Sequence, residues 1–283
     1  MTAPDTVLPA NTVGRGVTRA FETARAENRA VLVGYLPAGF PTIPGAADFI
    51  AAMVDGGVDV VEIGLPYSDP TMDGPTVARA AEIALANGTR TRDVLATVEA
   101  VAALGVPTLV MTYWNPIERY GVPRFAADLA AAGGAGLITP DLIPEEAGEW
   151  IDASEGNGLD RVFLVAPSSR PERIASTAAV TRGFLYAVSI MGVTGLRAAT
   201  SSAAPGLVAR VRAATDLPVG VGLGVSNGDQ AAEVGAFADA VIVGSAFVRA
   251  VLDAPDTDSG LRAVRALAQD LSAGVRRRDG SAG

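Results

Sequence analysis

Short apolar runs, separated by alanine-rich segments, repeat along the whole chain. Within each run the apolar residues are continuous rather than alternating, which is typical of parallel strands that are covered on both faces. The predicted strands cover residues 30–36, 60–65, 107–113, 136–141, 161–167, 184–190, 218–224 and 240–246.

The alanine-rich segments between these runs are compatible with helices. Several end in glycine pairs such as Gly56 and Gly57, a common signature of helix C-termini. An additional amphipathic segment, 17–27, precedes the first predicted strand and could cover the bottom of a barrel. The segments with the clearest helical pattern are 46–55, 75–86, 94–104, 124–132 and 203–214.

Eight such β/α units in roughly 250 residues predict a closed (β/α)8 barrel, the TIM-barrel architecture. We therefore expect an α/β fold with one domain over 1–283, an extra N-terminal helix, and loose tails at about 1–12 and 276–283. The alternative is an open doubly wound sheet. It is less favoured because the first strand is not followed by a G-x-G-x-x-G turn.

The composition restricts the chemistry that the chain can perform. All 22 basic residues are arginine, and lysine, histidine and cysteine are absent. A Schiff base with a substrate carbonyl is therefore excluded, as are a Ser-His triad, a thiol nucleophile and metal ligands of the His or thiolate type. Acid–base catalysis must come from carboxylates or tyrosines.

The charge balance also narrows the partners. With 31 acidic residues the formal net charge is −9, which argues against nucleic acid and against anionic membranes. The N-terminus lacks the pattern of a signal peptide, and no uninterrupted apolar stretch of about 18 residues occurs. A cytoplasmic enzyme or binding protein is the expected class.

Glycine-rich sequences follow three of the later predicted strands. Gly224 lies at the end of the seventh strand, Gly244 and Ser245 at the end of the eighth, and 192–195 (GVTG) follows the sixth. The loops after strands seven and eight form the usual phosphate site of this architecture, because backbone N–H groups and a helix N-terminus point at the anion. A phosphorylated small molecule is the favoured ligand, and glycines that only make tight turns are the alternative.

Glu62 interrupts an otherwise apolar predicted strand. Burial of a carboxylate costs several kcal/mol unless it is paired, and an unpaired one responds with a raised pKa. A raised pKa is what a general acid requires near neutral pH. The alternative is a buried Glu–Arg ion pair inside the barrel.

Four further candidates carry less specific signals. Asp73 is either a catalytic carboxylate or the N-cap of a helix that starts near Pro75, and Asp69 is interpreted as an organiser of the same loop. Tyr186 either faces the barrel mouth or belongs to the core. Residues 113–116 (YWNP) are interpreted as a polar turn with an aromatic lid.

With these residues in view, the sequence resembles the tryptophan synthase alpha chain family from about residue 17 to residue 253. The matching motifs are 62–66 (EIGLP), 68–75 (SDPTMDGP), 111–117 (MTYWNPI), 192–195 (GVTG) and 222–224 (GLG). The motif at 68–75 is close to family-specific, whereas the glycine pairs are shared with many phosphate-binding barrels.

The resemblance implies a lyase that cleaves indole-3-glycerol phosphate to indole and glyceraldehyde 3-phosphate in tryptophan biosynthesis. It implies no cofactor in this chain, and an α2β2 heterotetramer with a beta chain that holds pyridoxal phosphate and consumes the indole. By the same resemblance Glu62 is the catalytic acid/base, Asp73 stabilises the indole N–H, and Tyr186 lies near the reacting side chain. The other implied roles are phosphate binding by Gly195, Gly224, Gly244 and Ser245, loop closure by Thr194, and a loop facing the partner at Asp69 and Pro70.

Some positions depart from the family pattern. Pro37 stands where threonine is common, Phe40 where aspartate is common, Arg79 where glutamine is frequent, and Ile190 where some members carry a polar residue. None of these changes removes a catalytic group. They bear on the pocket wall, on loop closure and, for Arg79, on the contact with a beta chain.

Elementary chemistry agrees with the implied reaction. A retro-aldol cleavage needs an electron sink, and this chain has neither a lysine nor a His or Cys metal ligand to supply one. Indole provides its own sink once C3 is protonated. Three alternatives stay open: a stand-alone lyase that releases indole, a weakly active allosteric partner subunit, and, more remotely, a phosphosugar isomerase.

Overall fold

The computed structural model describes residues 16–188 and 197–277. Within these ranges eight parallel strands close into a barrel in sequential order, from β1 beside β2 round to β8 beside β1. The predicted (β/α)8 barrel is therefore confirmed, and the open sheet is excluded. The strands are β1 (Val31–Pro37), β2 (Val60–Gly64), β3 (Thr108–Met111), β4 (Gly136–Thr139), β5 (Asp160–Val165), β6 (Leu185–Val188), β7 (Val219–Gly222) and β8 (Ala240–Val243).

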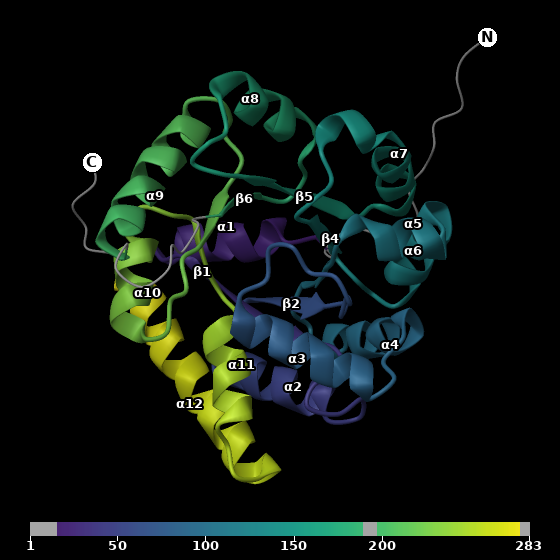
Figure 1. Cartoon of the computed structure of the whole chain (residues 1–283). Helices are drawn as coiled ribbons and strands as arrows, with labels where there is room; N and C mark the ends of the chain where they lie inside the picture. Colours follow the sequence, from purple (N-terminus) through teal and green to yellow (C-terminus); the bar gives the residue numbers. More distant parts are fainter. Residues whose placement is uncertain (1–15, 189–196, 278–283) are drawn as a thin grey trace.

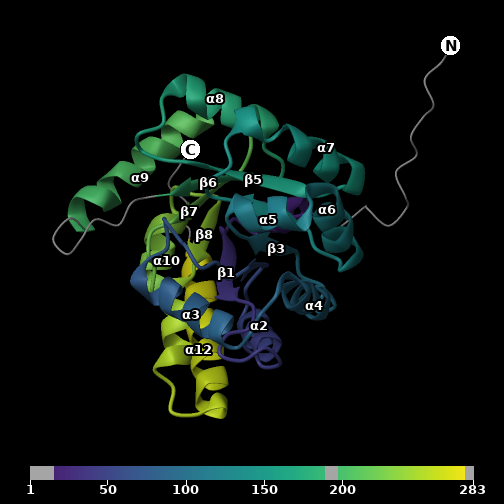
Figure 2. The same cartoon turned by 45° about the vertical axis from the view of Figure 1, so that its right-hand side comes forward.

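The helices form a layer around the strands (Figure 1), and Figure 2 shows the same arrangement after a 45° turn. Besides the short 3-10 helix η1 (Pro144–Glu146), they are α1 (Thr18–Ala26), α2 (Ala46–Asp55), α3 (Pro75–Ala86), α4 (Thr91–Ala102), α5 (Trp114–Tyr120), α6 (Val122–Ala131), α7 (Gly148–Asn157), α8 (Pro171–Val180), α9 (Arg197–Arg212), α10 (Gly228–Gly235), α11 (Ser245–Leu252) and α12 (Thr257–Val275).

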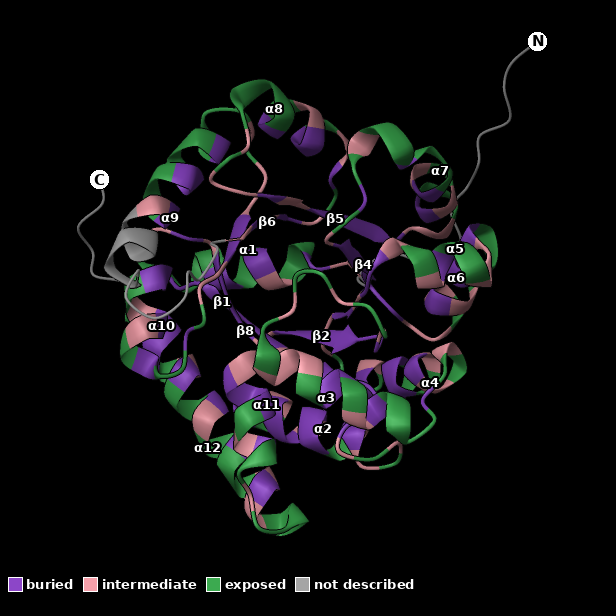
Figure 3. Cartoon of the chain, viewed as in Figure 1, coloured by how far each residue is buried: buried purple, intermediate pink, exposed green. Residues whose placement is uncertain are grey.

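Every strand except β7, which has Gly220 and Gly222 at alternate positions, divides its side chains between two apolar clusters. On β2, for example, Val61 and Ile63 pack outward against the helices, whereas Val60 packs in the barrel interior with Val31 and Val33 of β1. Successive residues of a strand point to opposite faces. Both faces of the sheet are therefore covered, the strands are almost entirely buried (Figure 3), and their sequences are continuously apolar.

Helix α1 closes the bottom of the barrel, as the sequence predicts. The N–H of Val17 donates to Oδ2 of Asp160 at 2.9 Å, at the N-terminal end of β5. The ring of Phe21 lies 5.5 Å from the ring of Phe184, the residue before β6. These contacts leave only the opposite end, where the strands terminate, open to a substrate.

Most strands are shorter than the apolar runs that predict them, whereas β1 keeps the predicted length and is shifted by one residue. The clearest case is the predicted strand 107–113, because β3 ends at Met111 and α5 begins at Trp114. The backbone N–H of Trp114 donates to both carboxylate oxygens of Asp141, at 2.9 and 3.1 Å, which anchors this helix start to the loop after β4. Residues 113–116 therefore begin a helix rather than form a free turn.

Arg276 and Arg277, which the sequence places at the start of a loose tail, follow α12 and form ion pairs. Arg276 pairs with Glu27 at 3.1 Å and Arg277 with Asp229 at 2.8 Å. Each arginine is about half exposed, so the contribution of each pair to stability is small. Across the described parts of the chain, none of the helices has the length and apolar character needed to cross a membrane.

Candidate active site

The interior of the barrel changes from apolar to polar toward the ends of the strands. On β1 the inward positions are Val31, Val33 and Tyr35, and Tyr35 lies in register beside Glu62 of β2. On β6 Tyr186 follows Phe184 on the inward face. The upper layer of the barrel therefore brings together a carboxyl group and two phenols at the end where TIM barrels carry their active sites.

Glu62 is almost completely buried, with 2% of its surface exposed, and its Oε1 has no hydrogen-bond partner. No ion pair reaches it from the residues that the structure describes, so nothing supports the buried Glu–Arg pair. Burial alone raises the pKa of Glu62 to about 8. The side chain is therefore neutral at pH 7 and can give up a proton.

The rings of Tyr35 and Tyr186 occupy space that glycines leave free. A Cβ on Gly64 would collide with the hydroxyl of Tyr35, and one on Gly222 would come within 2.8 Å of the hydroxyl of Tyr186. Burial and the nearby Glu62 raise the pKa of both phenols, with Asp73 contributing at Tyr35. Both phenols thus stay neutral, and Tyr186 faces the interior beside Glu62, in agreement with the first of its two interpretations.

Asp73 lies in the loop between β2 and α3, which crosses the front of the barrel in Figure 1. Its Oδ1 accepts a hydrogen bond from the hydroxyl of Tyr113 at 3.2 Å. The N-cap of α3 is Gly74, and no side chain caps that helix. Asp73 is therefore not the N-cap. It is a half-buried carboxylate whose pKa is raised by burial and lowered by Tyr113.

The strand ends that the sequence predicts as a phosphate site have suitable backbone geometry. Gly224 adopts a left-handed φ of 66°, which a residue with a side chain rarely does. Gly244 is the N-cap of α11, which begins at Ser245, so the positive end of the α11 dipole opens next to β8. Thr194 and Gly195 lie outside the described residues, as does Ile190.

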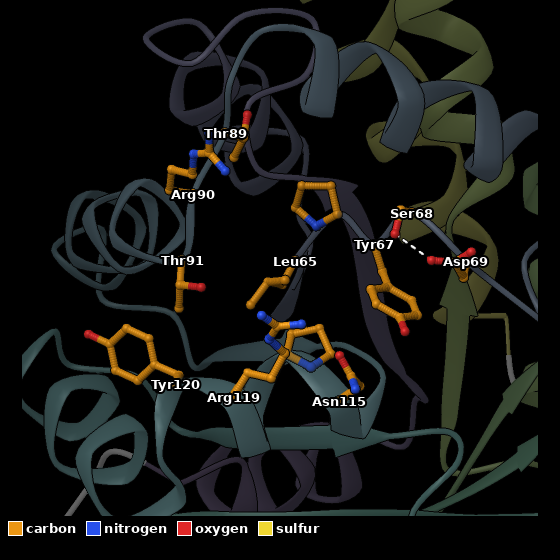
Figure 4. Close-up of a pocket in the computed structure, with 12 residues that line it drawn as sticks. Leu65, Tyr67, Ser68, Asp69, Thr89, Arg90, Thr91, Asn115, Arg119 and Tyr120 are labelled. Atoms are coloured by element: carbon orange, nitrogen blue, oxygen red, sulfur yellow. Dashed lines mark hydrogen bonds between the residues drawn. The ribbon is translucent and has the colours of Figure 1, made fainter.

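Asp69 and Pro70 lie in the same loop as Asp73, closer to the end of β2. Asp69 is exposed and accepts a 2.5 Å hydrogen bond from the hydroxyl of Ser68. Asp69 and Ser68 border a pocket of about 600 Å³ between the loop after β2, the start of α4, and α5 (Figure 4). Neither Glu62 nor Asp73 is among the residues that line this pocket.

The sequence does not predict two residues of this site. Tyr35 belongs to an apolar predicted strand, and the register of β1 and β2 places it beside Glu62. Tyr113 belongs to a predicted turn, and its hydroxyl contacts both Met72 and Asp73. An inward-facing tyrosine near the end of a predicted strand was the available signal for Tyr35.

The arrangement combines a neutral carboxyl group that can donate a proton with a second carboxylate that can stabilise positive charge. Two phenols interact electrostatically with Glu62, and that of Tyr35 also interacts with Asp73. No lysine is present in the chain. Such a site suits a substrate that becomes cationic on protonation and carries its own electron sink.

Comparison with known proteins gives a consistent result. The family model described as "Tryptophan synthase alpha chain" matches residues 21–276. The tryptophan synthase alpha chain of Salinispora arenicola is 62% identical over 257 residues, covering 91% of this chain and 96% of the relative. That of Mycobacterium avium is 60% identical over 258 residues, covering 91% and 93%.

Solved structures agree with the sequence relatives. A structure of Mycobacterium tuberculosis tryptophan synthase is 57% identical with a TM-score of 0.86, covering 92% of this chain and 98% of that chain. Tryptophan synthase subunit alpha of Legionella pneumophila is 32% identical with a TM-score of 0.84, covering 92% and 97%. The chain belongs to the tryptophan synthase alpha chain family, the lyases that cleave indole-3-glycerol phosphate to indole and glyceraldehyde 3-phosphate.

Proposed function

We propose that Glu62 and Asp73 together carry out the cleavage of indole-3-glycerol phosphate in this chain. The observation that carries the proposal is the burial of Glu62, unpaired and with a pKa of about 8, in the mouth of the barrel. General acids work best when their pKa lies near the operating pH. The neutral side chain of Glu62 is therefore poised to protonate the substrate.

The reaction balances with these two residues alone. The carboxyl group of Glu62 protonates C3 of the indole ring, and the resulting cation is stabilised by the carboxylate of Asp73 at the ring N–H. The bond between C3 and the side chain then breaks, and its electron pair returns to the ring to give indole. The hydroxyl on the departing carbon loses its proton to Glu62 and becomes the aldehyde of glyceraldehyde 3-phosphate.

The remaining site residues hold the substrate in our proposal. Gly224, Gly244 and Ser245 bind the phosphate through backbone N–H groups, assisted by the start of α11. The roles expected for Gly195 in phosphate binding and for Thr194 fall outside the described residues. Tyr186 packs beside the reacting carbon in this proposal, since its hydroxyl lies next to Gly222 and its phenol interacts electrostatically with Glu62.

The test is the variant Glu62→Gln, which keeps the size of the side chain and removes its acidic proton. We expect kcat for indole formation to fall by about 10²- to 10⁴-fold, because positioned acid–base groups contribute factors of this size. The matched control is Glu99→Gln on the exposed face of α4, which should keep the wild-type rate. Near-normal turnover by Glu62→Gln would contradict the proposed acid.

We further propose that the chain works beside a beta chain in an α2β2 assembly located in the cytoplasm. The partner holds the pyridoxal phosphate, since this chain has no lysine to bind it. Asp69 and Pro70 belong to the surface that faces the partner, and exposed Met72, with 52% of its surface accessible, lies on the same loop. We also propose that the chain is organised as a single barrel domain over 1–283.

Steady-state indole formation with and without a beta chain tests this second proposal. We expect turnover in both conditions and a faster rate in the complex. The variant Asp69→Ala should weaken the response to the partner while sparing the rate of the isolated chain. A rate that does not respond to the beta chain would favour the stand-alone lyase.

A further inference from the structure

Tyr113 links the loop between β2 and α3, which carries Asp73, to the segment between β3 and α5. It immediately precedes α5 as its N-cap and is 6% exposed. Its hydroxyl accepts a hydrogen bond from the backbone N–H of Met72 at 2.8 Å and donates to Oδ1 of Asp73 at 3.2 Å. Its ring lies 5.4 Å from the ring of Tyr67 in the same loop.

Proton counting fixes the direction of these two bonds. A phenol has one proton and accepts with its lone pairs. The N–H of Met72 can only donate, so the oxygen of Tyr113 is the acceptor there. The phenolic proton is then free to point at Asp73, which as a carboxylate can only accept. Burial, together with the nearby Asp73, raises the pKa of Tyr113, so this proton stays on the phenol.

The other titratable groups near Asp73 offer no comparable support. Tyr35 of β1 interacts electrostatically with Asp73, Glu62 and Tyr113, without a hydrogen bond to Asp73 among the described residues. Glu62 of β2 is neutral at pH 7. Burial raises the pKa of Asp73, and the hydrogen bond from Tyr113 is the interaction that lowers it. The hydrogen bond from Tyr113 thus orients Asp73 and opposes the rise in its pKa that burial causes.

We propose that Tyr113 is a positioning residue, whose hydroxyl fixes Oδ1 of Asp73 so that Oδ2 receives the indole N–H. The proposal rests on the proposed role of Asp73 and adds the group that orients it. A hydrogen bond to a charged acceptor is about twice as strong as one between neutral groups. Loss of this hydrogen bond should raise the pKa of Asp73. Removal of a hydroxyl with a purely structural role would leave that pKa unchanged.

The test is Tyr113→Phe, measured as the pH profile of kcat/KM for indole formation. Asp73 must be ionised to act, so activity is lost as the pH falls through its pKa. Removal of the hydrogen bond raises that pKa, and we expect the acidic limb to move upward by about one pH unit. The basic limb, set by Glu62, should stay in place. At neutral pH kcat/KM should fall by about tenfold or more.

The matched control is Tyr120→Phe on the same helix, whose hydroxyl bonds instead to Asp128 at 2.6 Å. We expect it to keep the wild-type profile. A partial loss of folding in Tyr113→Phe would scale the plateau of the profile without moving its midpoint, so the midpoint remains decisive. An acidic limb that coincides with that of the wild type would overturn the proposal.

A double-mutant cycle separates this proposal from the one on which it rests. If Tyr113 acts through Asp73, then Tyr113→Phe should have no further effect on kcat in the Asp73→Asn background. Additive losses in kcat would show that Tyr113 acts independently of Asp73 and overturn the proposal. Wild-type turnover by Asp73→Asn alone would instead remove the catalytic role of Asp73.

Discussion

At the scale of one residue, the burial of Glu62 lowers the stability of the folded protein and at the same time raises the pKa of the carboxyl group. Its carboxyl group is buried without an ion pair, and the oxygen Oε1 has no hydrogen-bond partner. A buried polar group without a partner destabilises the folded state by about 1–3 kcal/mol. The same burial produces the pKa of about 8 that the proposed acid requires. Activity and instability therefore have one physical cause at this position.

This link predicts how the stability of the protein depends on pH. The folded-state pKa of Glu62 is raised, so between about pH 4.5 and pH 8 the folded protein keeps a proton that the unfolded chain has lost. The contribution of Glu62 to the free energy of unfolding therefore decreases as pH rises, by at most about 1.4 kcal/mol per pH unit. Glu62→Gln should remove this dependence.

Urea denaturation of the wild type and Glu62→Gln across this pH range checks the expectation. The stability advantage of the variant should grow from about pH 5 to pH 8 and then level off. Glu99→Gln serves again as the control, because Glu99 is exposed. Parallel stability curves for wild type and Glu62→Gln would show that burial of Glu62 has no such effect.

At the scale of elements, the sequence predicts the barrel because each strand carries its own signal. A continuously apolar run such as that of β8 requires cover on both faces, and few architectures accommodate eight such strands. The ends of the strands are less predictable, since tyrosine and tryptophan at 113–114 fit a strand or a helix start equally. Only the contact between Trp114 and Asp141, 27 residues apart, decides between them.

The candidate site was predictable to the extent that one residue breaks a local pattern. Glu62 does so in an apolar strand, and Asp73 lies in an unusual loop sequence. Tyr113 breaks no pattern, and its hydrogen bond to Asp73 spans 40 residues of sequence. Tyr35 enters the site only through its register with β2. Contacts between residues that are distant in sequence, such as these, are therefore visible only in the structure.

Helix α1 offers a test of whether the bottom of the barrel contributes to stability without affecting activity at the opposite end. Phe21 is 5% exposed and packs on Phe184 at the bottom. Phe21→Ala should lower the free energy of unfolding by about 3 kcal/mol, because truncation of a buried phenylalanine leaves a cavity. The active end lies opposite, so kcat at a temperature where the variant is folded should not change.

Thermal denaturation and steady-state kinetics on the same samples measure both effects. Leu104→Ala is the control, since Leu104 is 46% exposed and its truncation should change stability by less than about 0.5 kcal/mol. A loss of kcat in fully folded Phe21→Ala would show that the bottom of the barrel influences the mouth.

At the scale of the whole molecule, the net charge of −9 opposes the arrival of a phosphorylated substrate. The field of a protein acts on charged ligands during approach, and salt screens it over about 10 Å at 0.1 M. We therefore expect kcat/KM for indole-3-glycerol phosphate to rise by about two- to threefold as ionic strength increases from about 10 to 200 mM.

Initial rates at low substrate concentration across this range of salt test the effect. Indole-glycerol without the phosphate is the matched control, because an uncharged substrate should show no dependence on salt. A fall in kcat/KM with added salt would indicate that the mouth of the barrel attracts anions despite the total charge.

Closure of the barrel brings the end of α12 beside the segment that joins α1 to β1. Ala30, just before β1, donates its N–H to the carbonyl oxygen of Val275 at the end of α12, and Arg276 reaches Glu27 just after α1. These contacts lie at the face opposite Glu62, so the last helix locks the first β/α unit in place there. Attachment of the protein to a solid support through this face would therefore leave the path of the substrate untouched.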